Sequence, residues 1–117
     1  MGKTGDSFEK LVETMRRLRD PEKGCPWDRQ QTHESLIKFL IEEAYEAVDA
    51  IESSSPKFAE ELGDVLLQVL LHSQIASESR SFDIAEVANI LNKKLITRHP
   101  HVFGEVKVKD ADQVRRQ

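Results

Sequence analysis

The segment IEEAYEAVDA at positions 41–50 carries a dense group of carboxylates among apolar residues that recur with helical spacing. Its acidic residues are Glu42, Glu43, Glu46 and Asp49. A second acidic group, which includes Glu61 and Asp64, follows at positions 60–64. Carboxylates gathered in this way suit either a hard divalent cation or a solvated helix face. The choice depends on the elements that position them.

Apolar spacing predicts helices along most of the chain and no strand or hairpin of strands. The expected helices run from Asp6 (capping box with Glu9) to near Asp20, from Thr32 to Glu52, from Lys57 to Ser77, and from Asp83 (capping box with Glu86) to His99. We expect residues 21–31 to form a loop and Asp110 to begin a further helix. The predicted fold class is all-α, a four-to-five-helix bundle with an antiparallel central helical hairpin.

The central hairpin would bring the two acidic groups together. In an antiparallel hairpin, residues at one level have numbers with a constant sum. Glu46 with Glu61 and Glu43 with Asp64 both sum to 107, and the implied centre falls on the turn-forming stretch SSSP at 53–56. Residues three apart share a helix face. We therefore expect two carboxylates from each helix to converge in one patch.

Four unpaired carboxylates at close range repel one another, so this patch requires a counter-charge. Mg²⁺ suits an all-oxygen set, and Mn²⁺ is a possible substitute. Zinc is disfavoured because no Cys/His cluster is present, and a di-iron site because Val69 replaces the Glu expected three residues before His72. The alternative, an ordinary solvated acidic face, stays open.

Composition bounds the class of protein. The chain has 117 residues, 38% of them apolar and 32% charged, which predicts one domain over 1–117. A net charge of −4 argues against a general nucleic-acid binder. The apolar run 65–75 is too short to cross a bilayer, no secretory signal begins the chain, and Cys25 is a lone cysteine. These features favour a cytoplasmic protein.

The apolar stretch VLLQVLL predicts a helix enclosed by its own domain or by a partner subunit.

The acidic motifs resemble a known family. EEAYE (42–46) followed by ELGD (61–64) is similar to the E-E-x-x-E and E-x-x-D signature of the MazG family of all-α nucleoside triphosphate pyrophosphohydrolases. RLRDPEKGCPWDRQQTH (17–33) and RHPHVFGE (98–105) resemble the flanking segments, so the likeness covers roughly residues 8–105. It implies a Mg²⁺-dependent, homodimeric or larger helical enzyme that hydrolyses nucleoside triphosphates to monophosphates and pyrophosphate. The chain resembles the first of two such domains.

The resemblance also implies roles for individual residues. By position, the metal ligands are Glu43, Glu46, Glu61 and Asp64. Lys94 and Arg98 are marked for the triphosphate, although both are also ordinary cations for a helix C-terminus. Lys38 is close enough in sequence to reach the same ligand or to pair with Glu34 or Glu42.

The expected mechanism relies on metal because no P-loop motif is present. A Mg²⁺-activated water would attack the α–β linkage, with Glu42 or Glu46 orienting it or accepting its proton. Trp27 would stack on the base or, alternatively, anchor its loop in the core. Cys25 lacks a base partner, and His99 and His101 are interpreted as structural. The competing hypothesis is a catalytically weak dimerisation, regulatory or nucleotide-binding domain of a longer two-domain protein.

Overall fold

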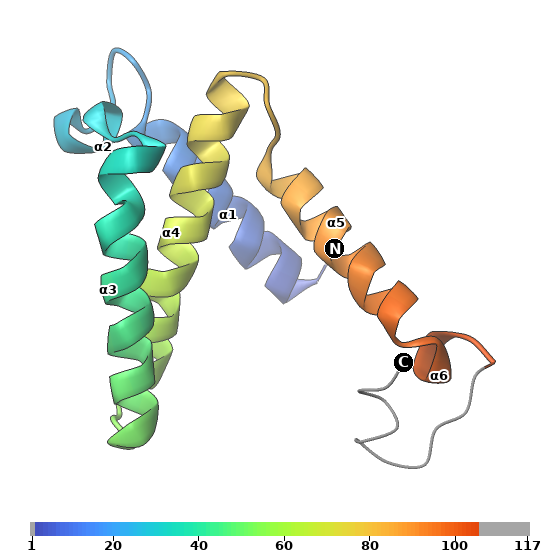
Figure 1. The fold of residues 1–117 in the computed structure, drawn as a ribbon. Helices are drawn as coiled ribbons and strands as arrows, with labels where there is room; N and C mark the ends of the chain where they lie inside the picture. Colours follow the sequence, from blue (N-terminus) through green and yellow to red (C-terminus); the bar gives the residue numbers. More distant parts are fainter. Residues whose placement is uncertain (1, 106–117) are drawn as a thin grey trace. The chain divides into compact units, whose positions relative to one another are not determined.

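The structure, a computed structural model, describes residues 2–105, and these residues form helices without a strand (Figure 1). The helices are α1 (Lys3–Leu18), α2 (Pro26–Gln30), α3 (His33–Glu52), α4 (Phe58–Glu78), α5 (Ile84–Arg98) and α6 (Pro100–Phe103). The chain divides into two compact units, Met1–Ser81 and Phe82–Gln117, which are described separately below. The all-α prediction is confirmed. The helix predicted from Asp110 lies outside the described residues.

Helices α3 and α4 lie side by side as the predicted antiparallel hairpin (Figure 1). Thr32 caps α3 through a reciprocal pair of hydrogen bonds with Ser35, which satisfies two backbone N–H groups of the first turn. At the other end, the Ser55 N–H donates to the Ala50 carbonyl at 2.9 Å and the Ser54 N–H to Ile51 at 3.3 Å. These two bonds form a Schellman motif that reverses the chain into α4.

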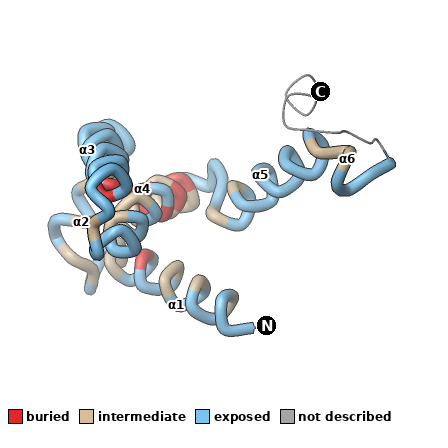
Figure 2. The backbone as a smooth tube through the Cα atoms, turned by 90° about the horizontal axis from the view of Figure 1, so that it is seen from below, coloured by how far each residue is buried: buried red, intermediate tan, exposed pale blue. Residues whose placement is uncertain are grey.

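The core of the first unit lies where α1, α3 and α4 meet, and Figure 2 shows its buried residues in red on these helices. The buried apolar residues are Met15 on α1, Leu36, Ala47 and Ala50 on α3, and Leu70, Leu71 and Ala76 on α4. Leu36, Ala47 and Ala50 share one face of α3, because their separations of 11 and 3 residues are close to whole helical turns. The face of α3 toward α4 carries Leu36, Phe39, Glu43, Ala47 and Ala50, whereas Leu40 and Ile51 are exposed.

The start of α1 and the segment 21–31 differ from the sequence prediction. The capping box predicted at Asp6 and Glu9 is wrong: α1 already begins at Lys3, with Gly2 at the N-cap, so both acidic residues lie inside the helix. The predicted loop at 21–31 contains the short helix α2, which Pro26 begins at the first helical position. Proline is favoured there because its missing N–H has no helical partner.

The loop before α2 folds back on the end of α1. The Cys25 N–H donates to the Leu18 carbonyl at 2.8 Å, and the Gly24 N–H donates to Asp20 at 3.0 Å. A Cβ atom on Gly24 would lie 2.6 Å from the Asp20 carbonyl oxygen and closer still to that of Leu18. Only glycine therefore allows this close approach of backbone to backbone.

The second unit contains α5 and α6. Asp83 caps α5 by accepting a hydrogen bond from the Glu86 N–H at 2.9 Å, which is one of the two bonds of the predicted capping box. The helix ends before Pro100, and that proline begins α6, which the sequence analysis did not anticipate. Among the described residues, no helix combines the length and apolar character needed to span a membrane.

Candidate metal and nucleotide site

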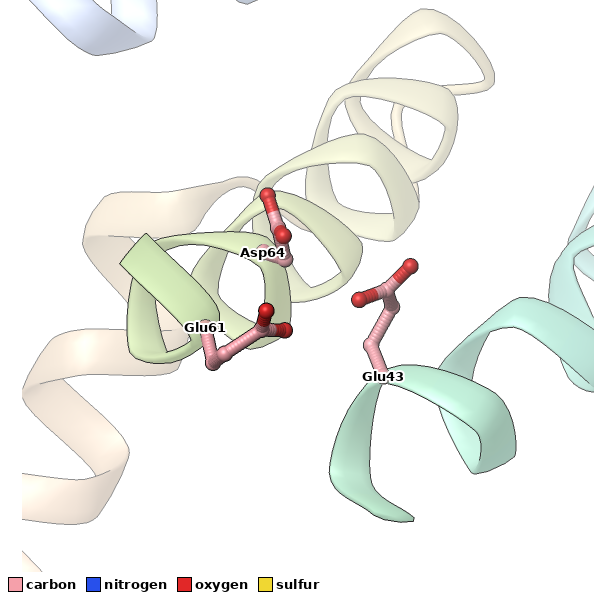
Figure 3. Close-up of side chains that lie close together, drawn as sticks. All are labelled: Glu43, Glu61 and Asp64. Atoms are coloured by element: carbon pink, nitrogen blue, oxygen red, sulfur yellow. The ribbon is translucent and has the colours of Figure 1, made fainter. Parts of the chain in front are cut away.

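Three of the four predicted ligands converge between the two helices of the hairpin (Figure 3). Glu43 projects from α3, and Glu61 and Asp64 project from α4 toward it. Each offers a carboxylate oxygen, and these oxygens all lie within 4.8 Å of one another. All three side chains are half-buried, so the cluster remains open to a ligand from solvent.

The hairpin's local structure explains this convergence. Glu61 lies in the first turn of α4, where the partial positive charge of the helix N-terminus favours a carboxylate. Asp64 follows three residues later on the same face. Glu43 lies on the inner face of α3, between Leu36 and the buried Ala47. The apolar packing of the hairpin thus holds acidic groups of both helices at one level.

Burial and mutual repulsion perturb the cluster. Partial burial raises the pKa of Glu43 above its usual range, and the charges of Asp64 and Glu61 raise it further. The pKa of Glu61 is raised in the same way, by burial first and then by Asp64, with Lys57 as a small opposing influence. No cation within the cluster offsets this repulsion among the described residues. The arrangement therefore costs stability unless a positive ion binds.

Glu46, the fourth predicted ligand, lies outside the set of three. It is exposed on α3, but its charge raises the pKa of both Glu43 and Glu61, so it borders the cluster. Glu42 is likewise exposed and acts electrostatically on Glu43. Both glutamates flank the three convergent carboxylates without joining them.

The donor set fits a hard divalent cation. Oxygen ligands of Mg²⁺ lie about 2.0–2.1 Å from the ion, so opposite ligands are roughly 4.2 Å apart. The cluster's limit of 4.8 Å is slightly wider, and a small change of side-chain rotamer closes the difference. The set contains only carboxylates, a ligand type that suits Mg²⁺ and Mn²⁺ better than it suits softer metals.

Lys38 and Trp27 both contact Phe39, next to the hairpin's inner face. The Lys38 ammonium lies 5.1 Å from the centre of the Phe39 ring, and no ion pair joins Lys38 to Glu34 or Glu42 in the described part of the chain. The Trp27 ring meets Phe39 edge to face at 5.8 Å and 73°, yet it stays 49% exposed. Trp27 therefore anchors α2 to α3 and still offers a free indole surface.

The remaining predicted residues lie outside this hairpin. Lys94 and Arg98 are exposed on the last two turns of α5, in the second unit, and their role toward phosphate stays a prediction. His99 is the C-cap residue of α5, and its Nδ1 lies 2.6 Å from the Leu95 carbonyl oxygen. The centre of its ring lies 5.3 Å from that of His101. Cys25 is the N-cap residue of α2.

Sequence reasoning missed the residues that fasten the hairpin to its surroundings. Arg19 binds Glu78 through two hydrogen bonds of 2.8 Å and also donates to the Asp28 and Gln31 carbonyls. His33 and His72 approach each other across α3 and α4. These partners lie 59 and 39 residues apart, and helical periodicity carries no signal for such pairs.

Comparison with known proteins bears on the same helices. Residues 31–103 match the family described as the MazG nucleotide pyrophosphohydrolase domain. The chain belongs to the MazG family. The matched range includes every residue of the carboxylate cluster, as well as Lys94 and Arg98.

Three relatives illustrate the similarity. A protein of Thermotoga maritima named nucleoside triphosphate pyrophosphohydrolase/pyrophosphatase MazG is 58% identical over 90% of this chain and 41% of its own length. The nucleoside triphosphate pyrophosphohydrolase of Escherichia coli K12 is 39% identical over 93% of this chain and 42% of its own length. The uncharacterized protein YabN of Bacillus subtilis is 49% identical over 92% of this chain and 22% of its own length. The chain thus spans well under half of these relatives.

Proposed function

We propose that this MazG domain hydrolyses nucleoside triphosphates to nucleoside monophosphates and pyrophosphate, using Mg²⁺ bound by its carboxylate cluster. The observation that carries the proposal is the convergence of Glu43, Glu61 and Asp64, which form no ion pair with any other described residue and lie within the range matched to the family. The names of the Thermotoga maritima and Escherichia coli relatives support the same reaction.

In this proposal Glu43, Glu61 and Asp64 hold the metal, and Glu46 completes the set from the edge of the cluster. When bound, Mg²⁺ would supply Lewis-acid chemistry that offsets the charge of the triphosphate and activates water for attack at the α–β linkage. Glu42 and Glu46 are the candidates to orient that water or accept its proton, because both are exposed beside the cluster.

The substrate's other groups are assigned by charge and shape. Lys94 and Arg98 contribute a point charge and a planar fork for phosphate oxygens, and Lys38 is a third cation for the same purpose. The half-exposed indole of Trp27 provides a surface for stacking of the base.

We also propose that a second copy of the chain covers the outer face of the hairpin. Large apolar side chains stand exposed on α3, on the side away from its buried stripe. They are Ile37 (56% exposed), Ile41 (62%), Tyr45 (76%), Val48 (50%) and Ile51 (58%). Leu62 and Leu66 extend this apolar surface on α4. A homodimer that packs helix faces together buries such side chains.

The test is pyrophosphate release from a panel of nucleoside triphosphates with Mg²⁺, with EDTA, and with the nearly isosteric Glu61→Gln variant. Glu52→Gln, an exposed glutamate at the end of α3 outside the cluster, is the matched control. We expect release of pyrophosphate and monophosphate together, abolished by EDTA and by Glu61→Gln but retained by Glu52→Gln.

The second candidate function is a catalytically weak dimerisation, regulatory or nucleotide-binding domain of a longer protein. The exposed apolar face of α3 favours that hypothesis. Absence of turnover by well-folded wild-type protein across the whole panel would support it over the enzyme.

A further inference from the structure

A pair of histidines joins the two helices of the hairpin at the end remote from the turn. His33 is the first residue of α3, and His72 lies in the second half of α4. Their Nδ1 atoms are 2.8 Å apart, their rings are parallel within 2°, and the ring centres are 5.1 Å apart. The centre-to-centre distance exceeds the nitrogen distance by 2.3 Å, which is the diameter of an imidazole ring. The rings are therefore coplanar and meet edge to edge, with the two nitrogens pointing at each other.

This geometry is that of a straight N–H···N hydrogen bond, which requires one protonated and one bare Nδ1. A neutral imidazole carries a single N–H, so two arrangements exist. If His33 donates, neutral His72 must carry its proton on Nε2, which is buried and has no hydrogen-bond partner within residues 2–105. If His72 donates, its buried Nε2 is only a bare lone pair, and His33 keeps its own proton on an exposed side chain. A buried N–H without an acceptor costs more free energy than a buried lone pair without a donor, so His72 is the donor.

Protonation puts a hydrogen on the buried Nε2 of His72 whichever ring receives the proton. If His72 becomes the imidazolium, its Nε2 gains a hydrogen. If His33 becomes the imidazolium and donates, His72 must accept through Nδ1, which again puts its own hydrogen on Nε2. Both charged forms therefore bury an N–H that has no acceptor.

The surrounding charges do not relieve this conflict. Burial lowers the pKa of His72 below its usual 6.5, and the charge of His33 lowers it further. From α1, the cation Arg19 is engaged with Glu78 of α4 and does not act on His72. No carboxylate of α3 or α4 among the described residues favours the charged form of His72.

We propose that His33 and His72 form a pH-sensitive clasp of fixed tautomer, in which neutral His72 donates its Nδ1–H to His33 and ties the first turn of α3 to α4. Acidification breaks the clasp. Because the unfolded chain gains a proton at pH values where folded His72 still excludes one, the clasp's contribution is intact above pH 6.5 and is lost as the pH falls below it. The inference does not depend on the proposed enzymatic activity.

Nitrogen NMR of ¹⁵N-histidine-labelled protein tests the clasp directly. At pH 8 we expect His72 to carry its proton on Nδ1 and His33 on Nε2, with a scalar coupling between the two Nδ1 nuclei across the hydrogen bond. On acidification, this coupling should vanish in the same step that protonates His72. A proton on Nε2 of His72 at pH 8, or coupling that persists after protonation, would overturn the proposal.

Substitutions give a second, independent readout. The amide of His72→Asn places an N–H near the position of Nδ1, so it can donate to His33 but cannot titrate. We expect this variant to lose much of the wild type's drop in melting temperature between pH 7 and pH 5, whereas His99→Asn, in the second unit, keeps the full drop. An unchanged drop in His72→Asn would contradict the proposal. If His72→Asn does not fold, the wild-type NMR experiment decides alone.

Discussion

The glutamates at the two ends of the α3–α4 hairpin have pKa values shifted in opposite directions. Near the turn, Glu43 and Glu61 face like charges, and the pKa of each is raised. Near the open end, Glu78 accepts two hydrogen bonds from Arg19, and that guanidinium lowers its pKa. The same residue type in the same pair of helices is thus strained at one end and stabilised at the other.

This difference in pKa shift separates an end that stabilises the fold from an end that carries the candidate metal site. At the open end, Thr32 caps α3, Arg19 binds two backbone carbonyls of the α2 segment, and the histidines bond to each other. Such contacts hold the fold. At the turn end, Glu43, Glu61 and Asp64 form no ion pair with any other described residue, which lowers stability, and the proposed divalent cation would offset their repulsion.

The largest expected contrast is in metal affinity. We predict that Asp64→Asn lowers the affinity for Mn²⁺ by at least about a hundredfold, because it removes one charged ligand from the cluster. Glu78→Gln, the equivalent change at the paired end, should leave the affinity unchanged. Titration with Mn²⁺ followed by electron paramagnetic resonance measures the affinity of each variant. Equal affinities in the two variants would contradict the proposed difference between the two ends of the hairpin.

The next contrast is in folding stability. Arg19→Ala should lower the free energy of unfolding by about 2–3 kcal/mol, because it strands two carbonyls and one carboxylate at the paired end. The Arg19 side chain is only 9% exposed, whereas Arg16, which pairs with Glu13 on the surface of α1, is 59% exposed. Arg16→Ala is the matched control and should leave urea unfolding essentially unchanged. A similar loss in both variants would show that burial of the pair is unimportant.

The two ends should also respond oppositely to acid in the absence of metal. A raised pKa means that folded Glu61 binds its proton before the unfolded chain does, so acidification toward pH 4.5 relieves repulsion and stabilises the turn end. Glu78 behaves conversely: its contribution is present above pH 4.5 and is lost as the pH falls through its lowered pKa.

Urea unfolding in EDTA at a series of pH values checks this sign. Glu61→Gln should be more stable than the wild type at pH 7, and the difference should shrink as the pH approaches 4.5. Glu78→Gln should be less stable than the wild type at pH 7, and its deficit should shrink below pH 4.5. Parallel curves for the two variants would refute the opposite character of the two ends.

The smallest expected effect concerns the helix ends themselves. Ser54 and Arg80 follow α3 and α4 with positive φ angles of 53° and 59°, a conformation that favours glycine. Ser54→Gly and Arg80→Gly should each raise stability by about 0.5–1 kcal/mol. Ser53→Gly, at a φ of −92°, should give no such gain. Thermal unfolding that fails to separate Ser54→Gly from Ser53→Gly would exclude this source of strain.

Local pattern was enough to predict the hairpin and most of its acidic cluster. Helical spacing and the turn stretch at 53–56 fix the approximate level of each residue, which brought Glu43, Glu61 and Asp64 together before any coordinates. Glu46 lies at the border of the cluster because matched level does not fix rotation about the helix axis, and its role as a ligand stays a prediction. The true inner face of α3 passes through Glu43 and Ala47, which leaves Glu46 at the edge.

The remainder depends on contacts between distant residues. Arg19 and Glu78 meet only after α1 packs on α4, and the His33–His72 bond depends on the registry of α3 against α4. The helix α2 was missed because the segment 21–31 holds two prolines and a glycine, which predict a loop, although Pro26 in fact begins a helix. Tertiary packing overrode the local preference there.

The most direct test of the central claim is the melting temperature of the wild type and Glu61→Gln, each in EDTA and in Mg²⁺. If the turn end is built for a cation, Mg²⁺ raises the melting temperature of the wild type, whereas Glu61→Gln melts higher than the wild type in EDTA and no longer responds to Mg²⁺. A variant that melts lower than the wild type in EDTA and keeps the full response to Mg²⁺ would contradict the account.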